Sequence, residues 1–394
     1  MKLVYVFLGG SAKGSSVQNK ILCQIAELRN SGIDAKGWFF SPSIEHEIFL
    51  DEHVKIIPLT PFKPSQKYFQ NFSINQDYYR QINGYLKAKQ NEFDQVFLRH
   101  GSSGPEYFKL LLAFKDRLNL FIPSNSIAEN FKEKQYASKT GIGSFLFRWW
   151  EFYKYFYVLE KELIKSFLPQ LKAVIVFTEE FGRILNSQAR NKIRIIYNRD
   201  GADCRNVPVR IPNTQENGKV ELLFMKGSSM QQPWSGLDRL IKSIEDNGAD
   251  RFKLYITGNV IDEGIYKKPF VKLTGRLSEE DLQNLVNQVD LGVSNLANYM
   301  IKFNETTNLK SRDYFARGLP FVQANSMPDV EGTEGDKYYL QLSNDDSIIP
   351  MQDIYEFAHK IRKDSEHTKN MRAFAESTLD WKVTVAELAA ELKK

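Results

Sequence analysis

The sequence is poor in the residues that mark several special classes of protein. Its 394 residues include only two cysteines, Cys23 and Cys204, with no Cys-x-x-Cys pair and no cysteine–histidine cluster. This excludes a disulfide framework and a cysteine-rich metal site. The N-terminal apolar run, residues 3–8, is far shorter than the ~20 residues that cross a bilayer, and no small-residue cleavage site follows it. We therefore expect a protein of the reducing cytoplasm.

Neither sign of charge dominates the chain. It has 53 Lys and Arg against 48 Asp and Glu, a net charge of +5 spread over the whole length. This balance suits an anionic ligand or an acidic membrane surface and does not call for nucleic acid. The content of 42% hydrophobic and 26% charged residues is that of a globular chain. At ~100 to 200 residues per domain, the length predicts about two domains.

Short apolar runs alternate with helical periods in both halves, which is typical of parallel sheets covered by helices. A polar stretch at 203–219 interrupts the pattern and is interpreted as a linker. We therefore predict Rossmann-like domains at 1–202 and 220–376, and a C-terminal helix at 377–394 that needs a surface to pack on, such as the first domain. The predicted strands are 3–8, 35–40, 54–58, 95–99, 118–122, 173–177, 193–197, 220–225, 252–257, 270–273, 291–294 and 320–323.

A glycine-rich loop follows the first predicted strand. Gly9, Gly10 and Ser11 lead into a helix, and a helix N-terminus favours an anion. The spacing is not Gly-x-Gly-x-x-Gly, and the second strand ends near Ser41 instead of the acidic residue that holds ribose in nicotinamide-binding domains. A dehydrogenase is therefore disfavoured. Contact of Gly10 with a ligand and a simple glycine turn both remain open.

Polar side chains also end the next strands of the first half. Arg99 and His100 place a cation and an imidazole at the carboxyl edge of the sheet, where open parallel sheets bind ligands. For His100, a place at the ligand site and a purely structural role both remain open. Glu129, at a predicted helix start, either contacts a ligand or caps its own helix.

An aromatic segment occupies residues 145–157. Nine of its thirteen residues are aromatic, and Arg148 and Lys154 lie among them. Aromatic side chains beside cations suit the headgroup boundary of a membrane or a lipid-linked substrate. A densely packed core helix is the alternative.

The strongest chemical pattern lies in residues 304–322. Two carboxylates, Glu305 and Asp313, stand eight positions apart, one before a predicted helix and one within it. Amides at the helix start can hold a diphosphate, while flanking carboxylates accept hydrogen bonds from sugar and ribose hydroxyls.

This segment resembles the Glu-x7-Glu signature of the retaining GT-B glycosyltransferases known as glycosyl transferase group 1. Glu305 matches the first acid, Asp313 the second, and 316–320 the Ala-x-Gly-x-Pro that follows. The resemblance covers most of residues 170–390 and implies an α/β GT-B fold, with two Rossmann-like domains whose parallel sheets face a central cleft. Further matching segments are 196–203, 222–229, 234–241, 255–258, 271–276 and 289–294.

The resemblance also implies a site. A UDP- or GDP-sugar donor would lie mostly on the second domain, with Glu305 at the sugar, Asp313 at the ribose, and the amides of Asn308 and Leu309 at the phosphates. Gly10 would face the donor and His100 would be catalytic. The acceptor would lie on the first domain, where Arg99 and Glu129 are candidate contacts. Transfer with retention would use a donor phosphate oxygen as base, without a cofactor or a metal.

One departure from the family concerns the phosphates. The family usually places an Arg and a Lys after the first strand of the second domain, but residues 228–235 contain neither. Ser228 lies in that stretch and remains a donor-binding candidate, while Lys310, Arg276 and Arg312 are candidate substitutes for the missing cations. Asp313 is also one methylene shorter than Glu.

The sequence therefore predicts a hexosyltransferase that moves a sugar from a nucleotide-diphosphate donor to a glycan or lipid-linked acceptor in surface polysaccharide biosynthesis. We expect it in the cytoplasm, with the aromatic segment as the candidate for peripheral contact with the inner face of the membrane, and with no nucleic-acid partner. The alternative is a catalytically silent GT-B protein that binds glycan or a partner enzyme, an interpretation motivated by the missing cations.

Overall fold

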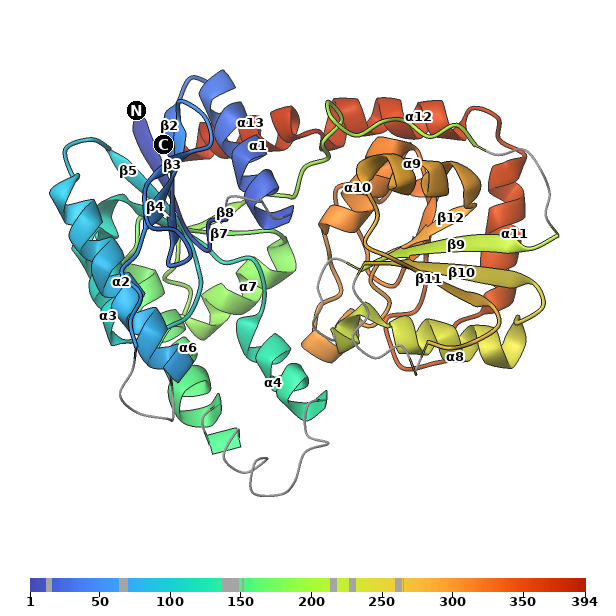
Figure 1. Ribbon diagram of the computed structural model, residues 1–394, viewed down its shortest axis with the longest axis horizontal. Coiled ribbons are helices and arrows are strands. Elements are labelled where there is room, and N and C mark those ends of the chain that lie inside the picture. The colour runs from blue at the N-terminus through green and yellow to red at the C-terminus, as the bar shows by residue number, and fades with distance from the viewer. Residues whose placement is uncertain are drawn as a thin grey trace. The chain divides into compact units, whose positions relative to one another are not determined.

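The computed structural model describes residues 1–11, 16–63, 70–136, 149–150, 152–212, 218–226, 232–258, 264 and 266–394. It divides the chain into two compact units, which are Met1–Arg199 with Val385–Lys394, and Asp200–Thr384. Each unit is a parallel sheet with helices packed on it (Figure 1). The predicted α/β class with two parallel-sheet domains is confirmed.

The sheet of unit 1 has the strand order β3-β4-β2-β1-β5-β6-β7-β8. Every neighbouring pair is parallel except β3 with β4. The central strands are buried because helices cover the sheet, which explains their nearly continuous apolar sequences. The strands are β1 (Lys2–Leu8), β2 (Asp34–Ser41), β3 (Ile48–Phe49), β4 (Val54–Pro58), β5 (Gln95–Arg99), β6 (Leu118–Phe121), β7 (Ala173–Val176) and β8 (Ile195–Tyr197).

Helices follow most strands of unit 1, as parallel connections require. Two π-helical segments, Phe152–Tyr157 and Leu163–Phe167, flank the short α6. The α-helices are α1 (Ser16–Asn30), α2 (Gln70–Ala88), α3 (Pro105–Ala113), α4 (Ser126–Tyr136), α6 (Val158–Glu162) and α7 (Glu179–Gln188).

The sheet of unit 2 has the order β11-β10-β9-β12-β13-β14, and all its pairs are parallel. Its strands are β9 (Val220–Met225), β10 (Phe252–Thr257), β11 (Val271–Gly275), β12 (Leu291–Val293), β13 (Phe321–Gln323) and β14 (Tyr339–Gln341). Its helices are α8 (Leu237–Asn247), α9 (Glu279–Gln288), α10 (Leu309–Arg317), α11 (Met351–Arg362) and α12 (His367–Phe374), and it shares α13 (Trp381–Leu392) with unit 1.

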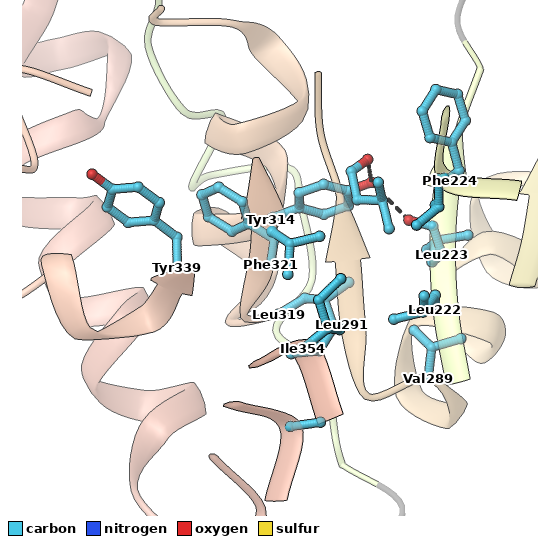
Figure 2. Packing of buried hydrophobic residues seen from close by; sticks show 14 of the residues in the cluster. Leu222, Leu223, Phe224, Val289, Leu291, Tyr314, Leu319, Phe321, Tyr339 and Ile354 are labelled. Atoms are coloured by element: carbon cyan, nitrogen blue, oxygen red, sulfur yellow. Dashed lines mark hydrogen bonds between the residues drawn. The ribbon is translucent and has the colours of Figure 1, made fainter. Parts of the chain in front are cut away.

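A buried tyrosine fixes α10 on the sheet of unit 2 (Figure 2). The Tyr314 hydroxyl lies 3.1 Å from the carbonyl oxygen of Leu223 and 3.0 Å from that of Val293. Gly292 makes room for the ring, because a Cβ there would come within 2.7 Å of it. Since these partners lie on β9 and β12, the tyrosine holds α10 against both strands.

The described part of the predicted linker packs within unit 2. Cys204 is buried in the core of that unit, and the Arg210 amide donates to the carbonyl of Arg317 at 2.8 Å. The Arg210 guanidinium is also buried, which lowers its pKa to about 10.

The end of the chain belongs to unit 1. The Gln95 side chain donates to the carbonyl of Leu392 at 3.1 Å, and Arg199 pairs with Glu387 at 2.7 Å. The apolar side of α13 from Val385 onward is buried.

The predicted aromatic segment is only partly described, because residues 145–148 and 151 lie outside the described residues. Trp149 is half-buried, with its ring centroid 5.0 Å from that of Phe131. Trp150 and Tyr153 are 47% and 61% exposed. These two side chains are therefore not part of a core. Within the described residues, no helix is both long enough and apolar enough to span a membrane.

Candidate functional site

Asn308 shapes the start of α10 in unit 2. Its Oδ1 accepts a hydrogen bond from the Ser311 amide at 3.0 Å, and its Nδ2 donates to Ser294 Oγ at 3.1 Å, just after β12. The cap leaves the amides of Leu309 and Lys310 without an acceptor inside the helix, because the first turn of any helix lacks one. These amides and the helix dipole form a site suited to an anion.

Lys310 adds a cation to this helix start. Its Nζ lies 4.4 Å from the centroid of the Phe224 ring on β9 and 3.4 Å from Asn295 Oδ1 after β12. Burial lowers the pKa of Lys310 to about 8. An anion bound here would favour the charged form of the ammonium.

Glu305 is positioned by a short backbone pairing just before α10. It forms a parallel bridge with Ser326, and the next amide, that of Thr306, donates to the carbonyl of Ser326 at 3.0 Å. The Glu305 side chain is half-buried. The carboxylate thus stands on a fixed backbone, three residues before the helix cap.

Asp313 is already engaged within its own helix. Its Oδ2 accepts from Arg317 Nε at 2.8 Å, and the buried Arg317 also donates to Gln283 at 2.6 Å and Glu279 at 2.5 Å. Burial raises the pKa of the Asp313 carboxyl more than Arg317 lowers it. Contact of Asp313 with a ribose therefore stays a proposal.

The other candidate cations of unit 2 differ in exposure and in their protein partners. Arg276 is exposed in the loop after β11. Arg312 is buried and committed, since its Nε donates to the carbonyl of Asp200 at 2.9 Å and it pairs with Asp329 at 2.5 Å. Ser228 lies outside the described residues.

Sequence reasoning did not single out Lys226, which directly follows β9. Its amide donates to the carbonyl of Thr257 at 3.1 Å, at the end of the neighbouring β10. Burial lowers the pKa of its side chain. Its position at a strand end was the signal that could have identified it.

His100 lies inside unit 1, at the end of β5. Its Nδ1 is 2.9 Å from the Tyr107 hydroxyl and its Nε2 is 3.2 Å from Glu160 Oε1. The side chain is buried, with 7% of its residue surface exposed. Both ring nitrogens are therefore engaged by protein groups.

Glu160, on α6, is the centre of this cluster and was missed from the sequence. It accepts hydrogen bonds from Ser103 Oγ at 2.7 Å and Ser126 Oγ at 3.2 Å. Burial raises the pKa of the Glu160 carboxyl, but the electrostatic interaction with His100 and the hydrogen bonds from His100, Ser103 and Ser126 outweigh burial and lower it overall. Glu160 thus joins the loops after β5 and β6.

The remaining predicted residues of unit 1 surround its sheet edge. Arg99 stacks over Phe121, with Cζ 5.2 Å from the ring centroid. Glu129, in the first turn of α4, accepts from Ser124 Oγ at 3.0 Å. The Gly10 amide donates to the carbonyl of Phe40 at 3.2 Å, so that this amide already has a partner.

The predicted site residues form one group in each unit. In unit 2, Glu305, Asn308, Leu309 and Lys310 lie together around the start of α10, Asp313 lies further along the helix, and Arg276 follows the edge strand β11. Among the described residues, no group of three or more His, Cys, Asp or Glu could hold a metal ion.

No family model and no curated protein sequence matches the chain. Solved structures do match it, over nearly its whole length. Sucrose-phosphate synthase from Thermosynechococcus elongatus is similar with a TM-score of 0.66 and 12% identity over 99% of this chain and 98% of that one. WaaG, a glycosyltransferase involved in lipopolysaccharide biosynthesis, has a TM-score of 0.59 and 14% identity over 100% and 99%. HepE from Anabaena, in complex with UDP-glucose, has a TM-score of 0.54 and 14% identity over 98% of each chain. The chain therefore has the GT-B fold that its sequence predicts.

Proposed function

We propose that this protein is a glycosyltransferase that takes its sugar from a nucleotide-diphosphate donor. The observation that carries the proposal is the start of α10, where two helix amides and the Lys310 ammonium follow directly after the backbone bridge that holds Glu305. The shared fold with HepE, a structure that holds UDP-glucose, supports a nucleotide-sugar donor.

In this proposal the diphosphate lies at the amides of Leu309 and Lys310. The helix dipole and the Lys310 ammonium offset its charge, and the exposed Arg276 adds a further cation. These groups stand in for the Arg and Lys that residues 228–235 lack. Because amides and cations supply the compensation, no metal is required.

Glu305 would then accept hydrogen bonds from hydroxyls of the transferred sugar, and Asp313 would accept hydrogen bonds from hydroxyls of the ribose. A half-buried carboxylate on a fixed backbone holds a sugar in one orientation, which favours attack on a defined face. We propose retention of configuration, with an oxygen of the departing diphosphate taking the acceptor's proton. For His100 we propose a positioning role, because both its ring nitrogens are engaged.

The acceptor would bind unit 1, and we propose a glycan or a lipid-linked saccharide of surface polysaccharide assembly. The exposed Trp150 and Tyr153 support peripheral contact with a membrane. Flotation with anionic liposomes tests this contact. We expect the protein to float with the liposomes at low salt. The double variant Trp150→Ser, Tyr153→Ser should reduce the fraction of protein that floats.

The donor is tested first by thermal unfolding of the protein with UDP, GDP, ADP, CMP and NAD. A ligand at ~100 times its Kd adds ~2.7 kcal/mol to the stability of the folded state. We expect one of the nucleoside diphosphates to raise the midpoint and NAD to leave it unchanged.

Glu305→Ala then tests the site. Release of the nucleoside diphosphate from the matching sugar donor should fall at least ~100-fold, because a contact to the reacting sugar is lost. The unfolding midpoint should stay near that of the wild type. Glu334→Ala, which removes an exposed carboxylate of the same unit, is the matched control. Unchanged turnover in Glu305→Ala would reject the site.

A second candidate, a catalytically silent GT-B protein that binds glycan or a partner enzyme, is favoured by one observation. The carboxylate proposed for the ribose, Asp313, is already paired with Arg317. If no nucleotide shifts the midpoint, this second candidate replaces the first.

A further inference from the structure

Arg99 carries a buried hydrogen-bond donor without an acceptor. Its Nη1 is shielded from solvent and has no hydrogen-bond partner among the described residues. An unsatisfied buried donor is costly, and more so when it is charged. Stacking over Phe121 compensates only part of this cost, since a ring face offers no directional acceptor.

A second cation lies over the same aromatic ring. Lys20, on α1, is 5% exposed, and its Nζ lies 5.2 Å from the Phe121 centroid and 4.0 Å from the Phe177 centroid. Arg99 and Phe121 are paired in register on β5 and β6, so their side chains leave the sheet on the same face. The two positive groups therefore approach one ring from a helix and from a strand.

This pair of cations lies at the carboxyl edge of the unit 1 sheet. Arg99, Phe121 and Phe177 stand at or just beyond the ends of β5, β6 and β7. Parallel sheets bind their ligands at this edge. The nearby buried carboxylate, Glu160, is occupied by His100, Ser103 and Ser126, and no acidic side chain of the described residues forms an ion pair with Arg99.

We infer that Arg99 forms a subsite for a phosphate group of a substrate. A guanidinium offers two parallel N–H donors that match phosphate oxygens. The inference rests on the proposed function, which supplies two sources for this phosphate: the acceptor of the transfer or its nucleotide donor.

The experiment measures binding of inorganic phosphate, pyrophosphate and the stabilising nucleotide to the full chain by calorimetry at constant ionic strength. Arg99→Gln removes the charge and keeps a planar polar group. Arg99→Lys keeps the charge without the paired donors, and it also serves if Arg99→Gln does not fold. Arg183→Gln, which removes an arginine that is 63% exposed on α7, is the matched control.

We expect at least tenfold weaker phosphate and pyrophosphate binding in Arg99→Gln, a smaller loss in Arg99→Lys, and no change in Arg183→Gln. Equal affinity in the wild type and Arg99→Gln, or no phosphate binding by the wild type, would overturn the subsite. Lys310→Met identifies phosphate that binds at α10 instead.

Nucleotide binding separates the two sources. A loss of nucleotide affinity in Arg99→Gln assigns the phosphate to the donor, and unchanged nucleotide affinity assigns it to the acceptor. If no nucleotide binds the wild type while phosphate binding still depends on Arg99, the subsite stands and the proposed function fails.

Discussion

The carboxyl edges of the two sheets carry similar polar residues but use them differently. In unit 1, Glu160 gathers His100, Ser103 and Ser126 into a buried cluster that satisfies its own members. In unit 2, Asn308 caps the first turn of α10, and two helix amides and the Lys310 ammonium remain available to an anion. The comparison teaches that a polar residue at a strand end indicates a ligand only when the protein leaves part of its hydrogen-bonding capacity unused.

The largest effect should come from breaking the closed cluster of unit 1. Glu160→Ala leaves the buried His100 and Ser103 and the half-buried Ser126 without their acceptor. We expect a loss of about 3 to 5 kcal/mol in the free energy of unfolding, as for other buried pairs that lose one partner. Denaturant unfolding followed by circular dichroism measures it.

Glu179→Ala is the matched control for this variant. Glu179 is 67% exposed and pairs with Arg183 at 3.5 Å on α7, so its loss should change the stability by less than about 0.5 kcal/mol. A loss in Glu160→Ala as small as in this control would mean that the cluster of unit 1 is not structural.

A smaller effect should come from the open site of unit 2, through the charge of Lys310. With a pKa of about 8, its protonated fraction falls about tenfold between pH 7 and pH 9. The affinity for a nucleoside diphosphate should fall by up to the same factor. Calorimetric titrations at both pH values measure this change, and Lys310→Met should lack it. A wild-type affinity independent of pH would exclude Lys310 from the phosphates.

The lowered pKa of Lys310 also makes the stability of the folded protein depend on pH. The folded-state pKa of Lys310, about 8, lies below the ordinary value of 10.5. Between these values the unfolded chain binds more protons, so this contribution to stability rises with pH from about 8 to about 10.5. Comparing unfolding of the wild type and Lys310→Met at pH 7.5 and 10 isolates it.

Most of the fold could be predicted because its determinants are local. All twelve predicted strands are present, with bounds that differ by at most two residues. The short β3 and β14 were not predicted. They are only two and three residues long, and pairing with a neighbour makes them strands. The polar composition of residues 203–219 predicts a linker and gives no sign that Cys204 and Arg210 are buried.

The site was less predictable because it depends on contacts distant in sequence. Asn308 as a cap follows from its place before a helix. The engagement of His100 by Glu160 joins residues 60 positions apart, and nothing local marks Glu160 as their partner. Asp313 shows the same limit, since Arg317 holds it together with residues of α9.

The smallest effect separates capping from ligand binding at Asn308. Asn308→Ala removes the side-chain acceptor of the Ser311 amide and should cost about 1 kcal/mol of stability. Asn308→Asp keeps the cap, and a carboxylate also suits the helix dipole, so its stability should stay near that of the wild type. The same carboxylate would repel a diphosphate at the amides of Leu309 and Lys310 and weaken its binding. Denaturant unfolding and nucleotide titration of both variants measure the two effects. If Asn308→Asp binds the nucleotide as tightly as the wild type, the diphosphate does not lie at this helix start, and the contrast between the two units would lose its functional meaning.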